Sequence, residues 1–167
     1  MQELTPKRSS DSATEMVEVV LPNDANPLGF MLGGAVMHLI DIAGAIAALR
    51  HARTPVVTAA VDGLEFLNPI KVGDFVVLKA RVTCVFTTSL EVEVVVHSEG
   101  AITGTRQLTS RAYLTFVVLE VDGVRVNIPP LTVETDEDRR LQDAARERRA
   151  EHLVRRARSA VERRAEE

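Results

Sequence analysis

Cysteine and aromatic residues are scarce in this sequence, and positive charge is not in excess. Its 167 residues hold one cysteine and no tryptophan, and the formal net charge is −4. A single cysteine excludes an intramolecular disulfide, which favours a reducing compartment. A nucleic-acid-binding domain would instead carry a clustered basic patch. We therefore expect a cytoplasmic protein that has no nucleic-acid partner.

Long apolar runs and metal-binding patterns are also missing. The longest apolar run, residues 35–49, is interrupted by His38 and Asp41, and it falls short of the ~20 residues that span a bilayer. The N-terminus lacks the basic-then-apolar pattern of a secretory signal. The four histidines and the one cysteine show no metal-ligand spacing. These features predict a buried core helix, no membrane partner and no bound metal.

The stretch from Asn26 to Asp41 is the most informative part of the sequence. It begins in a loop rich in turn-forming residues, passes through Gly33 and Gly34, and continues as an apolar helix. Asp41 lies inside that apolar run. Burying an unpaired ionised carboxylate is costly, so Asp41 needs a structural or a chemical role.

The apolar helix is predicted to run from about residue 33 to residue 53. Alanine, glycine and aliphatic residues occur on nearly every side of it, which is typical of a buried helix. Before it, residues 15–21 are expected to form a β-branched strand, and residues 22–32 form a shaped loop. A strand, a loop and a buried helix thus precede the rest of the chain.

After the helix, apolar residues alternate with polar ones, as in strands that have one buried face. Four strands are expected, at residues 56–67, 76–86, 90–97 and 108–118. Gly63 is expected to form a bulge, and the alternation places Cys84 on the inward face of its strand as a small core residue. Short loops join these strands, so consecutive strands pair antiparallel and the fold class is α+β.

These elements predict the hotdog fold, in which one curved antiparallel sheet wraps around one long apolar helix. Residues 15–133 are expected to form this domain, after a mobile N-terminus at residues 1–14. Residues 134–167 are rich in charged residues and alanine, and a C-terminal charged helix is expected there from about residue 136 to residue 164. A single sheet has exposed edges, so a homodimer through the sheet edges is expected.

In this frame the sequence resembles the hotdog acyl-CoA thioesterases of the brain acyl-CoA hydrolase and YciA-type group. The resemblance covers about residues 15–122. Its most specific part is a Pro-x-Asp-x-Asn loop, a glycine, a Gly-Gly pair and a helical aspartate fifteen positions after the asparagine. The matching positions are residues 22–26, 29, 33–34, 41, 50–51, 57–63, 66–69, 72–74 and 87–89.

The resemblance implies a catalytic pair formed by Asp41 of one subunit and Asn26 of the other. It implies that Thr58 lines the channel for the pantetheine arm of the substrate. Residues expected near the nucleotide end of coenzyme A are Thr87, Thr88 and Ser89. It also implies dimers that assemble into a hexamer, acting in lipid metabolism. No cofactor is expected, because coenzyme A is part of the substrate and the product.

The chemistry of these residues agrees with the roles that the resemblance implies. A desolvated carboxylate is a stronger base than one in water, so Asp41 would activate a water molecule or attack the thioester directly. Asn26 would position the water or the carbonyl without adding a charge. Gly33 and Gly34 leave backbone N–H groups free at the helix N-terminus, where they would hold the oxyanion of a tetrahedral intermediate.

Each of these residues also has a purely structural interpretation. Asp41 would then be bonded to backbone groups or to His38, one helical turn earlier. Asn26 would form a turn beside Pro27, and Asp24 would brace the loop. The two glycines would serve close packing of the helix.

Two departures from the family pattern leave the acyl-chain preference open. Leu32 stands where members usually have an aromatic residue or a histidine, and Pro27 follows the key asparagine.

The leading hypothesis from the sequence is an acyl-CoA thioesterase that hydrolyses fatty or short-chain acyl-CoA to a free acid and coenzyme A. Two alternatives stay open. A hotdog enoyl-CoA hydratase or dehydratase would place a histidine where this chain has Asn26. A noncatalytic acyl-CoA binding module would use the charged C-terminal helix as its interaction surface.

Overall fold

The computed structural model describes residues 4–120, 123–124 and 126–165 of the chain. The ends of the predicted N-terminal segment and of the C-terminal extension lie outside these residues. In chain order the elements are β1 (Lys7–Arg8), η1 (Ser9–Asp11), β2 (Thr14–Val19), η2 (Pro22–Asp24), α1 (Gly33–Ala52), β3 (Val56–Phe66), β4 (Phe75–Val85), β5 (Ser89–Glu99), β6 (Arg106–Val118), β7 (Leu131–Thr132) and α2 (Asp136–Ala165).

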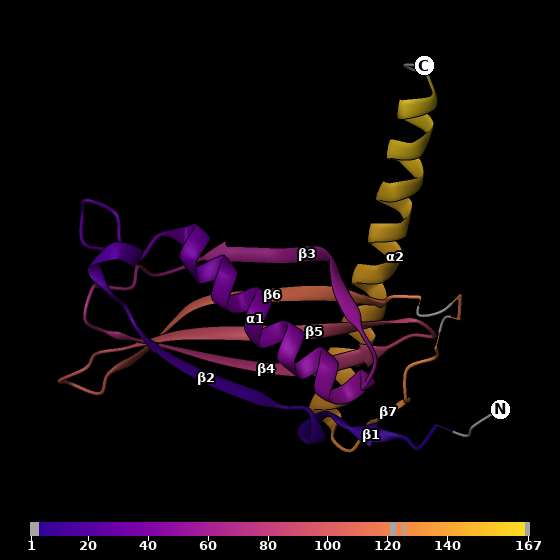
Figure 1. Cartoon of the computed structure of the whole chain (residues 1–167), viewed down its shortest axis with the longest axis horizontal. Helices are drawn as coiled ribbons and strands as arrows, with labels where there is room; N and C mark the ends of the chain where they lie inside the picture. The colour runs from indigo at the N-terminus through magenta and orange to yellow at the C-terminus, as the bar shows by residue number, and fades with distance from the viewer. Residues whose placement is uncertain (1–3, 121–122, 125, 166–167) are drawn as a thin grey trace.

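Five of these strands form one antiparallel sheet in the order β2-β4-β5-β6-β3. The helix α1 lies against one face of this sheet, and α2 runs across the opposite face (Figure 1). β3, the strand that follows α1, is an edge strand of the sheet. The predicted α+β hotdog fold, with its charged C-terminal helix, is confirmed.

The hydrophobic core lies between α1 and the inner face of the sheet. Alternate residues of β5 are fully buried there: Leu90, Val92, Val94 and Val96. Each such aliphatic side chain contributes about 1.5–3 kcal/mol by leaving water. The alternation of apolar and polar residues in the sequence therefore predicts correctly which side chains of this strand are buried.

Close approach of α1 to the sheet depends on a small residue in the middle of the helix. A Cβ added at Gly44 would lie 3.2 Å from Cζ of Phe116, which is fully buried on β6. A contact this short would require the Phe116 ring to shift by a few tenths of an ångström in a close-packed core. The small residues of α1 thus let the curved sheet wrap around it, as predicted.

α1 has two unlike faces. Residues that recur every three or four positions are buried against the sheet, whereas the opposite stripe, including Gly34, His38, Asp41 and Leu49, is exposed. The expectation that its own chain buries α1 on all sides is therefore wrong, because one sheet covers only one side of a helix. Among the described helices α1 alone is long and apolar enough to cross a membrane, a property that core helices of soluble proteins share.

Bulges decide which face some strand residues occupy. The register shifts between Asp62 and Glu65, so the bulge predicted around Gly63 is confirmed. A second shift follows Val82, after which Cys84 pairs with Glu91. Cys84 therefore lies on the outer face of the sheet, under α2, and the prediction that it points inward to the α1 core is wrong. It is buried there, and burial raises the pKa of its thiol.

The N-terminal segment that we expected to be mobile makes specific contacts in the structure. β1 pairs with β7 in a small parallel ribbon, beside the end of α1. The Lys7 ammonium donates a hydrogen bond of 2.6 Å to the carbonyl oxygen of His51. A cation at this position satisfies free carbonyl groups at the C-terminal end of α1.

α2 is the longest helix and has two parts. Its first turns lie on the outer face of the sheet, and its C-terminal part extends beyond β3 (Figure 1). Exposed apolar residues on the extending part include Leu153 and Val154. The sequence predicts that this helix packs along a neighbour or protrudes. Its first part packs on the sheet, and its C-terminal part protrudes.

Candidate active site

Asp41 and Thr58 meet at the centre of the candidate site. The Thr58 hydroxyl donates a hydrogen bond of 2.6 Å to Oδ1 of Asp41. Asp41 belongs to the exposed stripe of α1, and Thr58 lies on the edge strand β3. The structural alternative in which His38 holds Asp41 does not fit, because the described hydrogen-bond partner of this carboxylate is Thr58.

The environment of Asp41 differs from the predicted one. Its side chain is exposed in a single chain, so the expectation that the chain itself buries the carboxylate is wrong. The sheet lies on the other side of α1, and the Thr58 hydroxyl approaches the carboxylate from β3. Water is therefore excluded from Asp41 only if another surface covers this face.

Asn26 organises the loop between β2 and α1. Its Oδ1 accepts hydrogen bonds from the backbone N–H of Leu28 at 3.0 Å and of Phe30 at 3.2 Å. Its own N–H donates to the Phe30 carbonyl at 2.8 Å. Among the described residues Nδ2 has no hydrogen-bond partner. Asn26 is thus a turn former whose amide NH₂ stays available.

Other residues of this loop have the structural roles that the sequence suggests. Oδ2 of Asp24 accepts a hydrogen bond of 3.4 Å from the N–H of Leu21, and its carbonyl accepts one of 2.8 Å from Leu32. Asp24 therefore braces the loop. Within the described chain no hydrogen bond joins this loop to Asp41.

Gly33 and Gly34 open α1. Leu32 is the N-cap and provides no side-chain cap, so the first N–H groups of the helix have no side-chain acceptor. The backbone hydrogen bonds of this turn begin with Ala35 and Val36, both donating to the Leu32 carbonyl. The N–H groups of Gly33 and Gly34 therefore remain available to an anion, as helix N-termini commonly are.

Exposed apolar side chains lie near the Asp41–Thr58 pair. On α1 and on the α1-facing positions of β3 the large exposed apolar residues are Met37, Leu49, Val61 and Phe66. Monomeric soluble proteins rarely expose contiguous apolar patches of this kind. The patch lies along an unpaired strand edge, so it has the composition of an interface.

Thr87 and Thr88 lie in the turn between β4 and β5, and Ser89 is the first residue of β5. The Ser89 hydroxyl is buried and accepts a hydrogen bond of 2.7 Å from Arg149 of α2. Thr88 and Ser89 line a groove of about 940 Å³ between α2 and the sheet. The Thr87 carbonyl instead accepts a hydrogen bond from Ile128.

The arginines of α2 that line this groove were not identified from the sequence. They are Arg148, Arg149, Arg155 and Arg156. Their signal in the sequence is a pair of adjacent arginines that recurs after seven positions, which is about two helical turns. From the sequence alone, that composition predicts only a charged helix.

Two acidic residues of β5 lie buried beneath α2. Oε1 and Oε2 of Glu91 accept bonds of 2.8 Å and 2.9 Å from the Arg148 guanidinium, which also stacks 3.6 Å over the ring of Tyr113. Glu93 accepts from Arg81 at 3.0 Å. The Glu91–Arg148 pair holds α2 on the sheet, because breaking a buried pair is strongly destabilising. The Glu93–Arg81 pair joins β5 to β4.

Histidines and acidic residues give no sign of a metal centre. In the part of the chain that the structure describes, no group of three or more His, Cys, Asp or Glu side chains is arranged to hold a metal ion. His51 is fully buried, and its Nε2 donates to the Pro129 carbonyl at 2.9 Å. Burial lowers the pKa of His51, against the opposing effect of that hydrogen bond.

Comparison with known proteins identifies the family. A family model described as the thioesterase superfamily matches residues 28–105. The chain is 40% identical over 140 residues to the uncharacterized acyl-CoA thioester hydrolase YkhA of Bacillus subtilis, covering 84% of this chain and 81% of that protein. It is 31% identical to the human cytosolic acyl coenzyme A thioester hydrolase, of which it spans 36% of the length.

The solved structures that resemble this chain are also acyl-CoA thioesterases and hydrolases. A hexameric acyl-CoA thioesterase in its apo form matches with a TM-score of 0.86 at 36% identity, covering 92% of this chain and 99% of that chain. An acyl-CoA hydrolase of Staphylococcus aureus in complex with butyryl coenzyme A, coenzyme A and coenzyme A disulfide matches with a TM-score of 0.84 at 35% identity, covering 92% and 94%. Variants of the S. aureus enzyme with an aspartate, an asparagine or a threonine replaced by alanine also match. The chain therefore belongs to the thioesterase superfamily, among the acyl-CoA thioester hydrolases of hotdog fold.

Proposed function

We propose that the protein is a cytoplasmic acyl-CoA thioesterase in which Asp41 acts as general base or nucleophile. The observation that carries this proposal is the hydrogen bond of 2.6 Å from Thr58 to Asp41, made on the exposed stripe of the helix that begins with Gly33 and Gly34. A polar carboxylate, a hydroxyl and free helix N–H groups thus occur in one otherwise apolar region.

Residue spacing in the S. aureus enzyme supports these assignments. Its asparagine, aspartate and threonine variants lie at positions spaced by fifteen and seventeen residues. Asn26, Asp41 and Thr58 have the same two spacings in this chain. Residues chosen for substitution in that relative therefore correspond in type, order and spacing to the three residues proposed here.

The mechanism follows from the acid–base chemistry of the carboxylate. Asp41 removes a proton from a water molecule as the water oxygen bonds to the thioester carbonyl carbon. The N–H groups of Gly33 and Gly34 stabilise the oxyanion that forms. When the tetrahedral intermediate collapses, the C–S bond breaks, and the proton held by Asp41 passes to the departing thiolate. The products are a free acid and coenzyme A, and no cofactor takes part.

Direct attack by Asp41 is the alternative first step. The carboxylate oxygen would bond to the carbonyl carbon and form a mixed anhydride as the thiolate leaves, and water would then hydrolyse the anhydride. Both routes need an ionised Asp41 and the same oxyanion donors. The Thr58 hydroxyl orients the carboxylate in either route.

Asn26 is proposed to complete the site from a second copy of the chain. Its Nδ2 has no partner among the described residues, and the Asp41 face is exposed and apolar. A partner that packs on this face, with pairing of the two sheet edges, would bury the carboxylate and bring in the amide. The hexameric relative supports further assembly of such dimers.

Thr58 is also proposed to line the pantetheine channel, and Thr87, Thr88 and Ser89 are proposed to lie near the nucleotide. The exposed position of Thr58 on the edge strand supports its role. Thr88 and Ser89 line the α2 groove, which supports theirs. The Thr87 side chain is exposed beside them.

The hydratase alternative has less support. Such an enzyme needs a histidine that faces the acid, and the described partner of Asp41 is a threonine hydroxyl. An enoyl-CoA incubated with the protein would show hydration without thiol release if that alternative held. A noncatalytic module would bind acyl-CoA and leave it intact.

The test measures thiol release from a panel of acyl-CoA esters. Asp41→Asn is expected to lower kcat by about 10²–10⁴-fold, the usual contribution of an acid–base residue. Asn26→Ala is expected to lower kcat by about 10²–10³-fold, the usual cost of removing one hydrogen-bond donor from the reacting groups. Circular dichroism and gel filtration establish that each variant is folded and assembled. Wild-type rates for Asp41→Asn on every ester would contradict the proposal.

A further inference from the structure

The segment between β6 and α2 closes the C-terminal end of α1. Ala48 and Ala52 follow Asp41 by seven and eleven residues, about two and three helical turns, so they lie on the same side of α1 as Asp41. Both are buried although Asp41 is exposed. Ile128 belongs to the same buried cluster as these alanines. We therefore place residues 126–132 over this end of α1, where β1 and β7 also lie (Figure 1).

His51 holds this segment on the helix. Its ring is fully buried, and Nε2 donates a hydrogen bond of 2.9 Å to the carbonyl oxygen of Pro129. A carbonyl oxygen only accepts, so this bond requires a proton on Nε2. Nδ1 is buried and has no hydrogen-bond partner among the described residues. The neutral ring with its proton on Nε2 is therefore the form that fits this position.

A second proton on the His51 ring would have no acceptor. The new N–H on Nδ1 would be buried and unpaired, which is costly. The charged groups that act on the ring from neighbouring elements are the Lys7 ammonium of β1, which opposes protonation, and the Asp11 carboxylate of η1, which favours it. Asp11 is already paired with Arg8. Burial has a larger effect than the Pro129 hydrogen bond and lowers the pKa of His51, so acid favours a conformation in which the ring reaches water.

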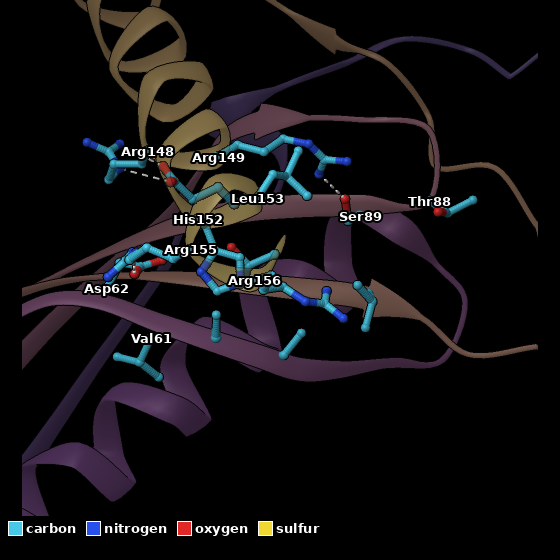
Figure 2. Close-up of a pocket in the computed structure, with 15 residues that line it drawn as sticks. Val61, Asp62, Thr88, Ser89, Arg148, Arg149, His152, Leu153, Arg155 and Arg156 are labelled. Atoms are coloured by element: carbon cyan, nitrogen blue, oxygen red, sulfur yellow. Dashed lines mark hydrogen bonds and ion pairs between the residues drawn. The ribbon is translucent and has the colours of Figure 1, made fainter. Parts of the chain in front are cut away.

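The same segment also holds the turn between β4 and β5. The N–H of Ile128 donates to the Thr87 carbonyl at 3.1 Å, and the N–H of Val118 donates to the Thr88 carbonyl at 2.9 Å. Val118 is the last residue of β6, so one side of the turn is fixed by the sheet. The other side is fixed by the residue that precedes Pro129. Thr88 lies at one end of the groove between α2 and the sheet (Figure 2), so two consecutive residues connect the buried histidine to this groove.

We propose that His51 is a positioning residue for coenzyme A: by holding Pro129, its neutral ring fixes the turn that carries Thr87 and Thr88. The proposal rests on the proposed function, which places these threonines near the nucleotide end of coenzyme A. The buried ring does not touch the substrate, so its loss is expected to change KM and not kcat. Protonation of the ring is expected to release the turn, so the affinity for the substrate falls in acid.

Hydrogen–deuterium exchange of the full chain tests the connection without an activity measurement. Pro129 and Pro130 have no N–H, so in a peptide that spans residues 126–130 the buried and hydrogen-bonded amide is that of Ile128. His51→Leu removes the donor and is expected to speed exchange of this amide about tenfold, because one hydrogen bond that holds the segment is lost. His51→Gln retains a donor and is expected to keep exchange slow.

Lys7→Met is the matched control. It removes a hydrogen bond of 2.6 Å from the same end of α1 and leaves the bond between His51 and Pro129 in place. Exchange of the Ile128 amide is expected to stay close to the wild-type rate in this variant. Equal exchange rates in His51→Leu and Lys7→Met would overturn the proposal.

Acid provides a test that does not require His51→Leu to fold. Exchange of the Ile128 amide is compared between the wild type and His51→Gln at pH 7.5 and at pH 5.5. Comparing the two proteins at the same pH removes the pH dependence of intrinsic exchange. The wild type is expected to lose protection in acid relative to His51→Gln. Identical profiles would show that the neutral ring is not what fixes the turn, and they would overturn the proposal.

Kinetic measurements connect the turn to the substrate. KM for acetyl-CoA is expected to rise about tenfold in His51→Leu, whereas kcat and the KM for acetyl-pantetheine stay at wild-type values. Faster exchange at Ile128 with an unchanged KM for acetyl-CoA would overturn the positioning role. A wild-type protein that releases no thiol from any ester would refute the proposed function, and the exchange measurements would still decide whether His51 fixes the turn.

Discussion

The two helices on opposite faces of the sheet are held in different ways. α1 packs by apolar contact, and its other face remains exposed with Asp41 on it. α2 packs by ion pairs, with Glu91 only 4% exposed beneath Arg148. The helix on the outer face is therefore held within one chain, whereas the inner helix needs a further surface to cover its exposed face.

This difference has a physical cause in each case. A carboxylate left buried without its cation costs several kcal/mol, so α2 must dock whenever Glu91 is in a folded sheet. An apolar helix face does not require one particular partner residue. It can be covered by any complementary surface, including a second copy of the chain. The candidate catalytic group lies on the side that is open. Assembly and activity are thus expected to depend on one another.

The largest expected effect comes from placing a charge on the open face of α1. Leu49 is 44% exposed there, two turns beyond Asp41. In Leu49→Glu the new carboxylate would be buried without a partner in a dimer, so dimer affinity is expected to fall at least about a hundredfold. Analytical ultracentrifugation measures this change, and activity at low protein concentration falls with it.

Val154→Glu is the matched control, because Val154 of α2 is 52% exposed on the extending part of that helix. Dimer affinity and activity are expected to remain at wild-type levels in this variant. A Leu49→Glu protein that assembles as tightly as Val154→Glu would show that the open face is not an interface.

The next effect concerns the ion pair that holds α2 on the outer face of the sheet. Arg148→Ala leaves Glu91 buried without its cation, and we expect the free energy of unfolding to fall by about 3 kcal/mol. Urea denaturation measures this loss. Arg140→Ala, an exposed arginine on the same helix, is expected to change stability by less than about 0.5 kcal/mol. Equal losses in the two variants would mean that the buried pair does not hold α2.

A smaller effect is expected for the Thr58 hydroxyl. Thr58→Val removes the donor to Asp41 and keeps the shape of the side chain, so kcat/KM is expected to fall about tenfold. Thr58→Ser retains the hydroxyl and is expected to keep most of the activity. The account of this hydrogen bond fails if the serine variant is as impaired as the valine variant.

The smallest effect is the pH dependence of stability that His51, buried at the C-terminal end of α1, is expected to cause. Because burial lowers the pKa of His51, the unfolded chain binds a proton more readily than the folded one. The free energy of unfolding therefore falls as the pH drops below about 6.5, by at most about 1.4 kcal/mol per pH unit. His51→Gln keeps a donor toward the Pro129 carbonyl, and we expect it to lose less stability between pH 7.5 and pH 5.5. Parallel pH profiles of the two proteins would exclude His51 as the cause.

Much of the fold follows from local patterns in the sequence. The alternation in β5 and the small residues of α1 predict one sheet that curves around one helix, and the structure agrees. Periodicity works here because every second residue of a strand meets the same environment. It fails at Cys84, because a bulge adds one residue and exchanges the two faces of the strand.

The site was predictable only in part. The residue types and spacing that mark Asn26 and Asp41 are local, so they are visible in the sequence. The exposure of Asp41 is not local, because it depends on which side of α1 the sheet covers. The groove is less predictable still, because the burial of Glu91 and the choice of which arginines stay unpaired depend on how α2 crosses distant strands.

One measurement tests most directly whether two copies share each active site. Asp41→Asn and Asn26→Ala are coexpressed in equal amounts, and thiol release by the mixture is compared with that of each variant alone. If one copy supplies Asp41 and the other Asn26, mixed dimers contain one intact site, and random pairing restores about a quarter of wild-type activity. Activity no higher than that of the separate variants would contradict the account and assign both residues to the same chain.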